Sequence, residues 1–171
     1  MSKLKIVNDN GVTLVEVMVT LAVMIILVGS LAFSYQGWIA KYRVESQVKE
    51  MYIDLMNGRA RAMERNRAHF ATGVASTYSI YEDTSPGPDG NGTLETGSDR
   101  LLPTYPKTVT YPLVWTGGGT TITFSRNGMI SPTGNMFLTT TADADYDCMT
   151  ITAMKIYMGK KNVSTLVCEA K

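Results

Sequence analysis

The chain has 171 residues, 44% of them hydrophobic and 18% charged, with a formal net charge of +1. This size suggests one domain with extra segments, and the composition excludes both a disordered chain and a protein with several membrane spans. The small net charge makes no case for a polyanionic partner of the whole chain, so any basic site must be local. With two cysteines and one histidine, the chain lacks both a disulfide framework and the ligands of a four-ligand zinc site, and we expect no metal and no cofactor.

An apolar run from Val12 to Phe33 follows a short polar leader that carries Lys3 and Lys5. A helix rises about 1.5 Å per residue, so about 20 residues cross a hydrocarbon core about 30 Å thick. We therefore predict a membrane-spanning or filament-core helix over residues 12–35. Lysines before a span favour a cytoplasmic leader, with the rest of the chain on the other side of the membrane.

Glu16 places a carboxylate inside this apolar run. A carboxylate in mid-membrane costs a few kcal/mol or more, although near a helix end it can reach the interface. Cleavage after Gly11 would remove only the leader and expose the α-amine of Val12 close to Glu16. One interpretation leaves Glu16 inert near the headgroups. The other pairs it with this amine, within one chain or between neighbouring chains, and the joint occurrence of Gly11, the apolar run and Glu16 favours it.

The stretch G-VTLVE-VMVTLAVMIILVG, residues 11–29, resembles the class III signal of type IV prepilins and type II secretion pseudopilins. The resemblance implies that a membrane-bound prepilin peptidase cuts between Gly11 and Val12 and methylates the new amine of Val12. It also implies that Glu16 guides assembly. The implied organisation is a leader over 1–11, a transmembrane or filament-core helix over 12–35 and a globular pilin-like domain over 36–171.

Beyond the apolar run the chain becomes amphipathic, and we predict one helix from about Thr13 to about Arg65. Its second half carries an apolar stripe at helical spacing, which must bury against something, most simply a β-sheet. The stripe consists of Val44, Val48, Met51, Tyr52, Leu55, Met56, Ala62 and Met63.

The helix ends in a local basic cluster of Arg59, Arg61, Arg65 and Arg67 beside one acid, Glu64. One interpretation is a contact with a polyanion or an acidic partner. The favoured one is a solvated last turn, where the helix dipole stabilises cations. The following His69 has no catalytic motif beside it and is expected in a loop or on the surface.

The rest of the chain is rich in β-strand and turn signals. Strands are expected at 74–83, 108–116, 121–124, 134–140 and 148–158 and in the last residues, with turns at Asn127-Gly128 and at Gly159 to Asn162. Residues 84–99 are expected to form a mobile surface loop, because their density of proline, glycine and aspartate cannot support a regular element. A calcium site is the less favoured alternative, because the acids depart from the spacing of an EF-hand. Short connections imply antiparallel pairing, so we predict an α+β fold in which an antiparallel sheet packs on the amphipathic half of the helix.

Cys148 and Cys168 are expected on neighbouring late strands. Outside the cytoplasm a disulfide between them is plausible and would contribute about 3 kcal/mol. The alternative is two buried free thiols.

Two further stretches, LMNGRARAMERNRA (55–68) and ITFSRNGMISPTGNMFL (122–138), are similar to segments of minor pilins and pseudopilins of the FimT/GspH type. This resemblance implies a structural subunit, not an enzyme, of a type II secretion pseudopilus or a type IV pilus. It would lie in the inner membrane with one span and an extracytoplasmic C-terminal domain, and join a filament on assembly. The implied partners are other pilins or pseudopilins, prepilin peptidase and the inner-membrane assembly platform.

The alternative function is a membrane-anchored extracytoplasmic binding module, with an anchored hydrolase as a remoter third. Some FimT-like proteins are linked to DNA uptake. Here, in addition to the arginine cluster, only Lys155, Lys160, Lys161 and Lys171 form a modest basic tail, too few charges for strong DNA binding alone.

Overall fold

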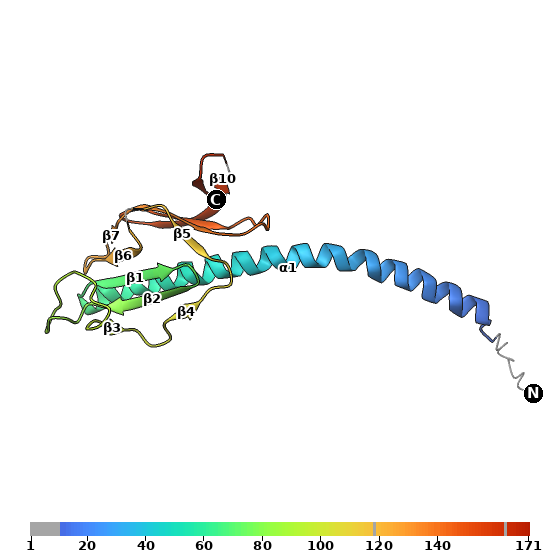
Figure 1. The fold of residues 1–171 in the computed structure, drawn as a ribbon, viewed down its shortest axis with the longest axis horizontal. Coiled ribbons are helices and arrows are strands. Elements are labelled where there is room, and N and C mark those ends of the chain that lie inside the picture. The colour runs from blue at the N-terminus through green and yellow to red at the C-terminus, as the bar shows by residue number, and fades with distance from the viewer. Residues whose placement is uncertain (1–10, 118, 163) are drawn as a thin grey trace, which may run out of the picture. The chain divides into compact units, whose positions relative to one another are not determined.

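The computed structural model describes residues 11–117, 119–162 and 164–171, without the side chains of 30–34. The chain divides into two compact units, one up to Ile39 and one over Ala40–Lys171, called here the N-terminal and C-terminal units. Helix α1, Leu14–Arg65, begins in the first unit and ends in the second (Figure 1). Its bounds agree with the predicted helix. The predicted leader, with Lys3 and Lys5, lies outside the described residues apart from Gly11.

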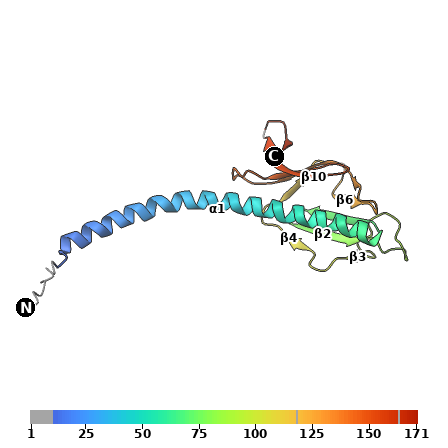
Figure 2. The same ribbon diagram turned by 180° about the vertical axis from the view of Figure 1, so that it is seen from behind.

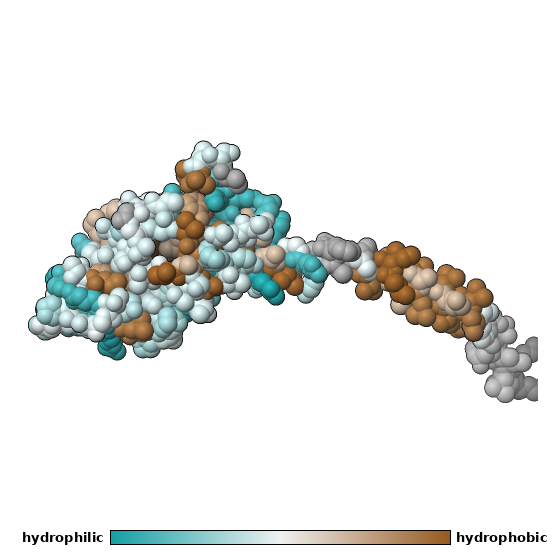
Figure 3. Space-filling model, viewed as in Figure 1, coloured by the Kyte–Doolittle hydropathy of each residue, from teal (hydrophilic) through white to brown (hydrophobic). Residues whose placement is uncertain are grey.

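The N-terminal unit is helical and exposes apolar side chains on its surface (Figure 3). Val15, Ile25 and Ile26 are each about 70% exposed, at 68%, 72% and 70%. Within the part of the chain that the structure describes, no helix combines the length and the apolar character needed to cross a membrane.

The part of α1 in the C-terminal unit buries the predicted apolar stripe. Its fully buried members are Val44, Val48, Met51, Leu55 and Ala62, whereas Met63 is exposed. Gly58 lies on the same stripe, and a Cβ there would stand 3.4 Å from both Ile80 and Phe124. The missing side chain therefore lets the helix backbone approach the strands closely.

Two antiparallel sheets, not the single predicted sheet, pack with this helix. The first has the order β3-β2-β1-β6-β7, with β4 also paired to β2 (Figure 1). Its strands are β1 (His69–Val74), β2 (Thr77–Glu82), β3 (Arg100–Leu101), β4 (Lys107–Thr108), β6 (Thr121–Phe124) and β7 (Ile130–Ser131). The predicted Asn127-Gly128 turn does join β6 to β7, and Gly128 has the positive φ that such a turn requires.

The second sheet has the order β11-β10-β9-β8-β5 and is seen from behind in Figure 2. Its strands are β5 (Leu113–Trp115), β8 (Gly134–Leu138), β9 (Cys148–Ile151), β10 (Ile156–Asn162) and β11 (Val167–Ala170). The helix and both sheets share one core. Ile80 and Phe124 represent the first sheet in it, and Leu138 and Ile151 the second.

Four local predictions are wrong. The strand expected at 108–116 is divided between β4 and β5, which lie in different sheets, and the strand expected at 148–158 is divided between β9 and β10. His69 is not on the surface but fully buried in β1, a strand that was not predicted from the sequence. Gly159 to Asn162 do not turn the chain but continue β10, and the chain turns between Asn162 and Val167. A Cβ on Gly159 would lie 2.0 Å from the carbonyl oxygen of Glu169. The lack of a side chain at Gly159 therefore allows the close approach of β10 and β11 and does not serve a turn.

A disulfide joins Cys148 of β9 to Cys168 of β11, with their Cα atoms 5.8 Å apart. The two strands are not neighbours as expected, because β10 lies between them in the sheet order. Gly159 pairs with Cys148 on one side and with Ala170 on the other. Phe137 packs against both cysteines in a small cluster separate from the main core.

Replacing both cysteines by alanine is expected to lower the free energy of unfolding by about 3 kcal/mol, because the bridge closes a loop with a sequence separation of 20. Urea denaturation of the full chain in detergent measures the difference. As a control, wild-type protein under reducing conditions should unfold like the variant. A loss well under 1 kcal/mol would contradict a stabilising role of the bridge.

Candidate processing and assembly site

The Gly11–Val12 peptide bond lies just before α1, outside any helix or strand. Both residues are exposed, and no described atom comes within 4 Å of the position that a Cβ on Gly11 would occupy. The described fold therefore does not itself require glycine at this position. An exposed peptide bond outside regular secondary structure is accessible to an enzyme that recognises the glycine.

Thr13 caps the start of α1, because its hydroxyl oxygen accepts a hydrogen bond of 3.3 Å from the backbone N–H of Glu16. Threonine is a favoured N-cap residue, and a glutamate three positions later is the spacing of a capping box. The cap explains why the helix begins at Leu14, directly after the residues to be exposed by cleavage.

Glu16 is exposed in the first turn of α1 and makes no ion pair with any described residue. The helix dipole favours a carboxylate at this end. The neighbouring side chains are apolar, with Val12 69% and Val15 68% exposed. The site therefore offers one uncompensated negative charge on an apolar helix, beside the position where cleavage would create an amine.

Residues 7–32 match the family described as the prokaryotic N-terminal methylation motif. This match covers the predicted signal, and it supports a type IV pilin-like family and a pilin-type or pseudopilin-type precursor that prepilin peptidase processes. Such a protein is membrane-anchored or part of a pilus, assembled with other pilins. No curated protein and no solved structure matches the chain.

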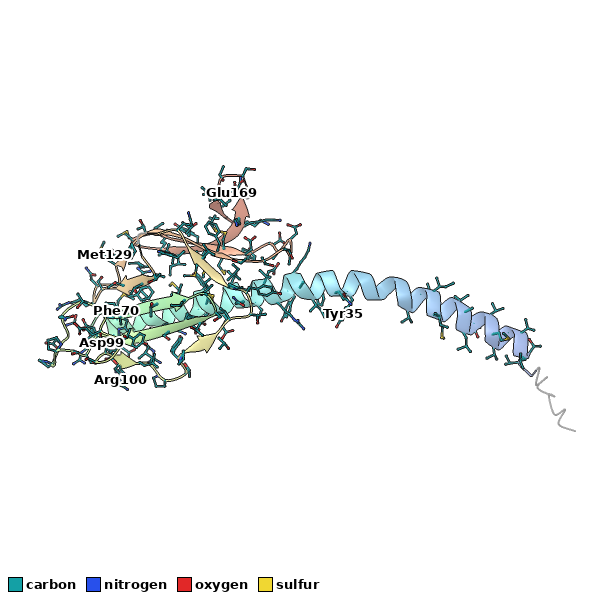
Figure 4. All side chains as sticks on the ribbon, viewed as in Figure 1. Tyr35, Phe70, Asp99, Arg100, Met129 and Glu169 are labelled. Carbon is teal, nitrogen blue, oxygen red and sulfur yellow. A yellow bond between two sulfur atoms is a disulfide. The ribbon has the colours of Figure 1, made fainter. Side chains whose placement is uncertain are left out.

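In the C-terminal unit the predicted arginine cluster is divided among different contacts. Arg65 and Arg67 form ion pairs with the carboxylate of Glu82 in β2, with nitrogen–oxygen distances of 3.1 and 3.9 Å. Arg100, which was not singled out from the sequence, forms a third ion pair with it at 3.7 Å. Glu82 has only 2% of its side chain exposed. Three guanidinium groups therefore compensate one buried carboxylate and connect the end of α1 to β2 and to β3, where Arg100 is labelled in Figure 4.

The remaining basic candidates do not form one surface. Arg59 donates a hydrogen bond of 2.7 Å to the carbonyl oxygen of Gly128, whereas Arg61 makes no ion pair with a described residue. On β10, Lys160 pairs with Asp143 at 2.5 Å and the ammonium of Lys161 lies 5.4 Å from the centre of the Phe137 ring. The geometry thus adds no support for a nucleic-acid site made of these cations together.

The loop over residues 84–99 is organised by two buried carboxylates at its ends, Asp83 and Asp99. Asp83 accepts hydrogen bonds from the N–H groups of Asn91 and Gly92, and Asp99 from those of Thr84, Ser85 and Glu95. Asp83 and Asp99 therefore bind backbone N–H groups of the loop itself. Across the described residues, no group of three or more histidine, cysteine or acidic side chains is arranged to hold a metal.

A second buried network, which sequence reasoning missed, centres on Asp54 of α1. The Tyr78 hydroxyl donates to its carboxylate, and Lys107 bridges Asp54 and Glu50 at 2.6 and 2.9 Å. Burial raises the pKa of Tyr78, and the bond to Asp54 raises it further. Burial also raises the pKa of Tyr105 to about 12, so both phenols stay neutral donors at physiological pH. The network ties α1 to β2 and β4.

His69 is fully buried beside Glu82 and Arg65, with Nδ1 3.3 Å from the carbonyl oxygen of Arg67. Its Nε2 has no hydrogen-bond partner among the described residues. Burial holds the pKa of His69 below its ordinary value of 6.5. The folded chain therefore keeps this imidazole neutral at a pH where the unfolded chain already protonates it.

We expect the free energy of unfolding to fall as pH drops below about 6.5, because the unfolded chain then binds a proton that folded His69 does not. The slope for one such group is at most about 1.4 kcal/mol per pH unit. Denaturation between pH 7 and pH 5 measures this, with His69→Gln as the control that should flatten the curve. An equal slope in that variant would show that other groups cause it.

Proposed function

We propose that the chain is a minor pilin or pseudopilin of the FimT/GspH type, a structural subunit of a type II secretion pseudopilus or a type IV pilus and not an enzyme. The proposal rests on the coincidence at one site of an accessible Gly11–Val12 bond, an apolar helix and Glu16, which forms no ion pair with any described residue. The match to the methylation motif over residues 7–32 supports the processing step.

Processing converts a neutral peptide nitrogen into a cation. The free α-amine of Val12 has an ordinary pKa of about 8, and a methylated amine remains a cation near neutral pH. Val12 lies four residues before Glu16 and two before Leu14, where α1 begins, so cleavage would place its amine close to the first helical turn that carries Glu16. The cut thus creates the only positive group that the mature helix start can offer to this carboxylate.

Assembly then follows from the cost of burying charge. In a filament core the first part of α1 packs among apolar neighbours, where an unpaired carboxylate is strongly penalised and a paired one is tolerated. We propose that Glu16 of one subunit pairs with the Val12 amine of its neighbour as the subunit leaves the inner membrane. The pair selects one axial register, because any other register buries both charges without a partner.

A membrane-anchored binding module is the second candidate, and one observation favours it. A cavity of about 210 Å³ lies between the two sheets of the C-terminal unit, open to solvent and mostly apolar. Met51, Leu55, Leu113, Trp115 and Ile122 are among its lining residues. In this alternative the helix serves only as a membrane tether for the C-terminal unit. The apolar lining of the cavity does not favour binding of DNA there.

Intact mass of the membrane-extracted protein is expected to show loss of residues 1–11 and one added methyl group when the chain is made in cells with prepilin peptidase. Gly11→Val is expected to retain the leader, because a branched side chain obstructs a site that reads glycine. Gly29→Val, a glycine elsewhere in the apolar run, is the control and should still be processed. An unprocessed wild-type chain in these cells would contradict the proposal.

Glu16→Ala is expected to be cut normally yet to enter sheared filaments at less than about a tenth of the wild-type level, because loss of the pair removes more than 1.4 kcal/mol of register preference. Quantitative immunoblotting of membrane and filament fractions measures both steps. Glu64→Ala, which removes an exposed acid of the same helix, should assemble normally. Normal assembly of Glu16→Ala would favour the tether.

A further inference from the structure

Three segments of the C-terminal unit meet around the tip of the β6–β7 hairpin. Arg59 of α1 donates to the carbonyl oxygen of Gly128, and the N–H of Ile130 donates a bond of 2.9 Å to the carbonyl oxygen of Ala153, in the β9–β10 turn. A Cβ on Gly128 would lie 2.6 Å from the sulfur of Met63. The end of α1, the hairpin and the β9–β10 turn therefore form one continuous surface.

This surface, called here the Met–Arg surface, presents three methionines and three cations. Its members are Met63 and Arg59, which contact the hairpin, and the exposed neighbours in sequence of the contacting residues, namely Arg126, Met129, Met154 and Lys155. Arg126 also lines a pocket that includes Asp83 and Asp89. Met129 is labelled in Figure 4 and directly precedes β7 in the hairpin.

The methionines are exposed to an unusual degree for apolar side chains in a folded unit. Met63 is 48%, Met129 47% and Met154 68% exposed, whereas Met51 and Met149 of the core are each 2% exposed. Methionine side chains adapt to different shapes, and methionine and arginine are both enriched in the buried centres of protein interfaces. The composition is therefore that of a docking surface.

The cations of this surface lack acidic partners among the described residues. Arg126 and Lys155 make no ion pair, and Arg59 bonds only a carbonyl oxygen. Glu64, the acid closest in sequence on α1, pairs with none of them. Elsewhere in the unit, in contrast, Lys107, Lys160 and Lys171 each meet a carboxylate within 2.9 Å. Among the described residues, the three cations of the Met–Arg surface therefore form no ion pair, which leaves their charged groups available to a partner's carboxylates.

We propose that the Met–Arg surface docks a partner protein segment in which carboxylates flank an apolar side chain. The guanidinium groups of Arg59 and Arg126 suit carboxylates, which they bind through paired hydrogen bonds. The methionines would cover the apolar side chain between them. A nucleic acid would leave these methionines unused, and the surface has no aromatic side chain on which a base could stack.

The hairpin is already ordered for such a contact. The backbone N–H of Ser125 donates to the carbonyl oxygen of Met129 at 2.9 Å, and the N–H of Met129 donates to the Ser125 hydroxyl at 3.0 Å. Little ordering of the backbone would then oppose binding. Docking at the Met–Arg surface requires neither cleavage after Gly11 nor assembly through α1.

The test uses the full processed chain in detergent micelles with 13C-methyl methionine and, as the probe, a synthetic peptide of alternating glutamate and leucine. Saturable shifts of the Met63, Met129 and Met154 methyl signals are expected, while those of Met51 and Met149 stay in place. The double variant Arg59→Gln/Arg126→Gln should raise the Kd at least about tenfold, since two charge-assisted hydrogen-bonded contacts are lost.

The matched control is Arg43→Gln, an exposed arginine that also makes no ion pair with a described residue and lies about 24 Å along α1 from Arg59. It should leave the Kd unchanged. A peptide in which glutamine replaces glutamate should bind at least about tenfold more weakly. Absence of shifts, an equal effect of Arg43→Gln, or tighter binding of an oligothymidylate to the same methyl groups would each overturn the proposal.

Discussion

The burial of one stripe of α1 is the constraint on which the fold depends. Two sheets, each built from its own set of strands, cover this stripe. Less than 3% of the surface of each of its central residues is exposed, namely Val44, Val48, Met51 and Leu55. Each sheet has apolar side chains to cover, and the helix supplies the common surface for both. Gly58 makes the approach close enough for contact. The apolar core of the C-terminal unit is thereby buried by residues of the same chain.

The first part of the same helix has the opposite character. Its apolar side chains are exposed in the described chain, and such a surface calls for lipid or for other helices around it. Once it is covered, Glu16 becomes a charge in an apolar setting and needs a cation. In the proposed function a proteolytic cut supplies this cation, because it frees the α-amine of Val12. A precursor is then unable to form the pair until it has been processed.

The sequence predicted the helix, its buried stripe and the Asn127-Gly128 hairpin, because each follows from local spacing or turn chemistry. It also led to the pairing of Cys148 and Cys168. It did not reveal two sheets, since strand partners far apart in the chain are chosen by packing and not by local propensity. His69 and Glu82 were missed for a related reason. Their burial depends on the convergence of Arg65, Arg67 and Arg100 around Glu82 in the folded chain, and the spacing of these residues in the sequence does not predict that convergence.

Carbodiimide cross-linking in assembled filaments tests the central claim most directly, because it joins an amine to a carboxylate only where the two are in contact. Filaments would be grown from a mixture of 14N-labelled and 15N-labelled subunits and analysed by mass spectrometry. The account predicts a Val12–Glu16 cross-link whose two halves carry different labels, in the proportion expected for neighbouring chains. A link found only within single chains, or none at Glu16 while other carboxylates react, would contradict it.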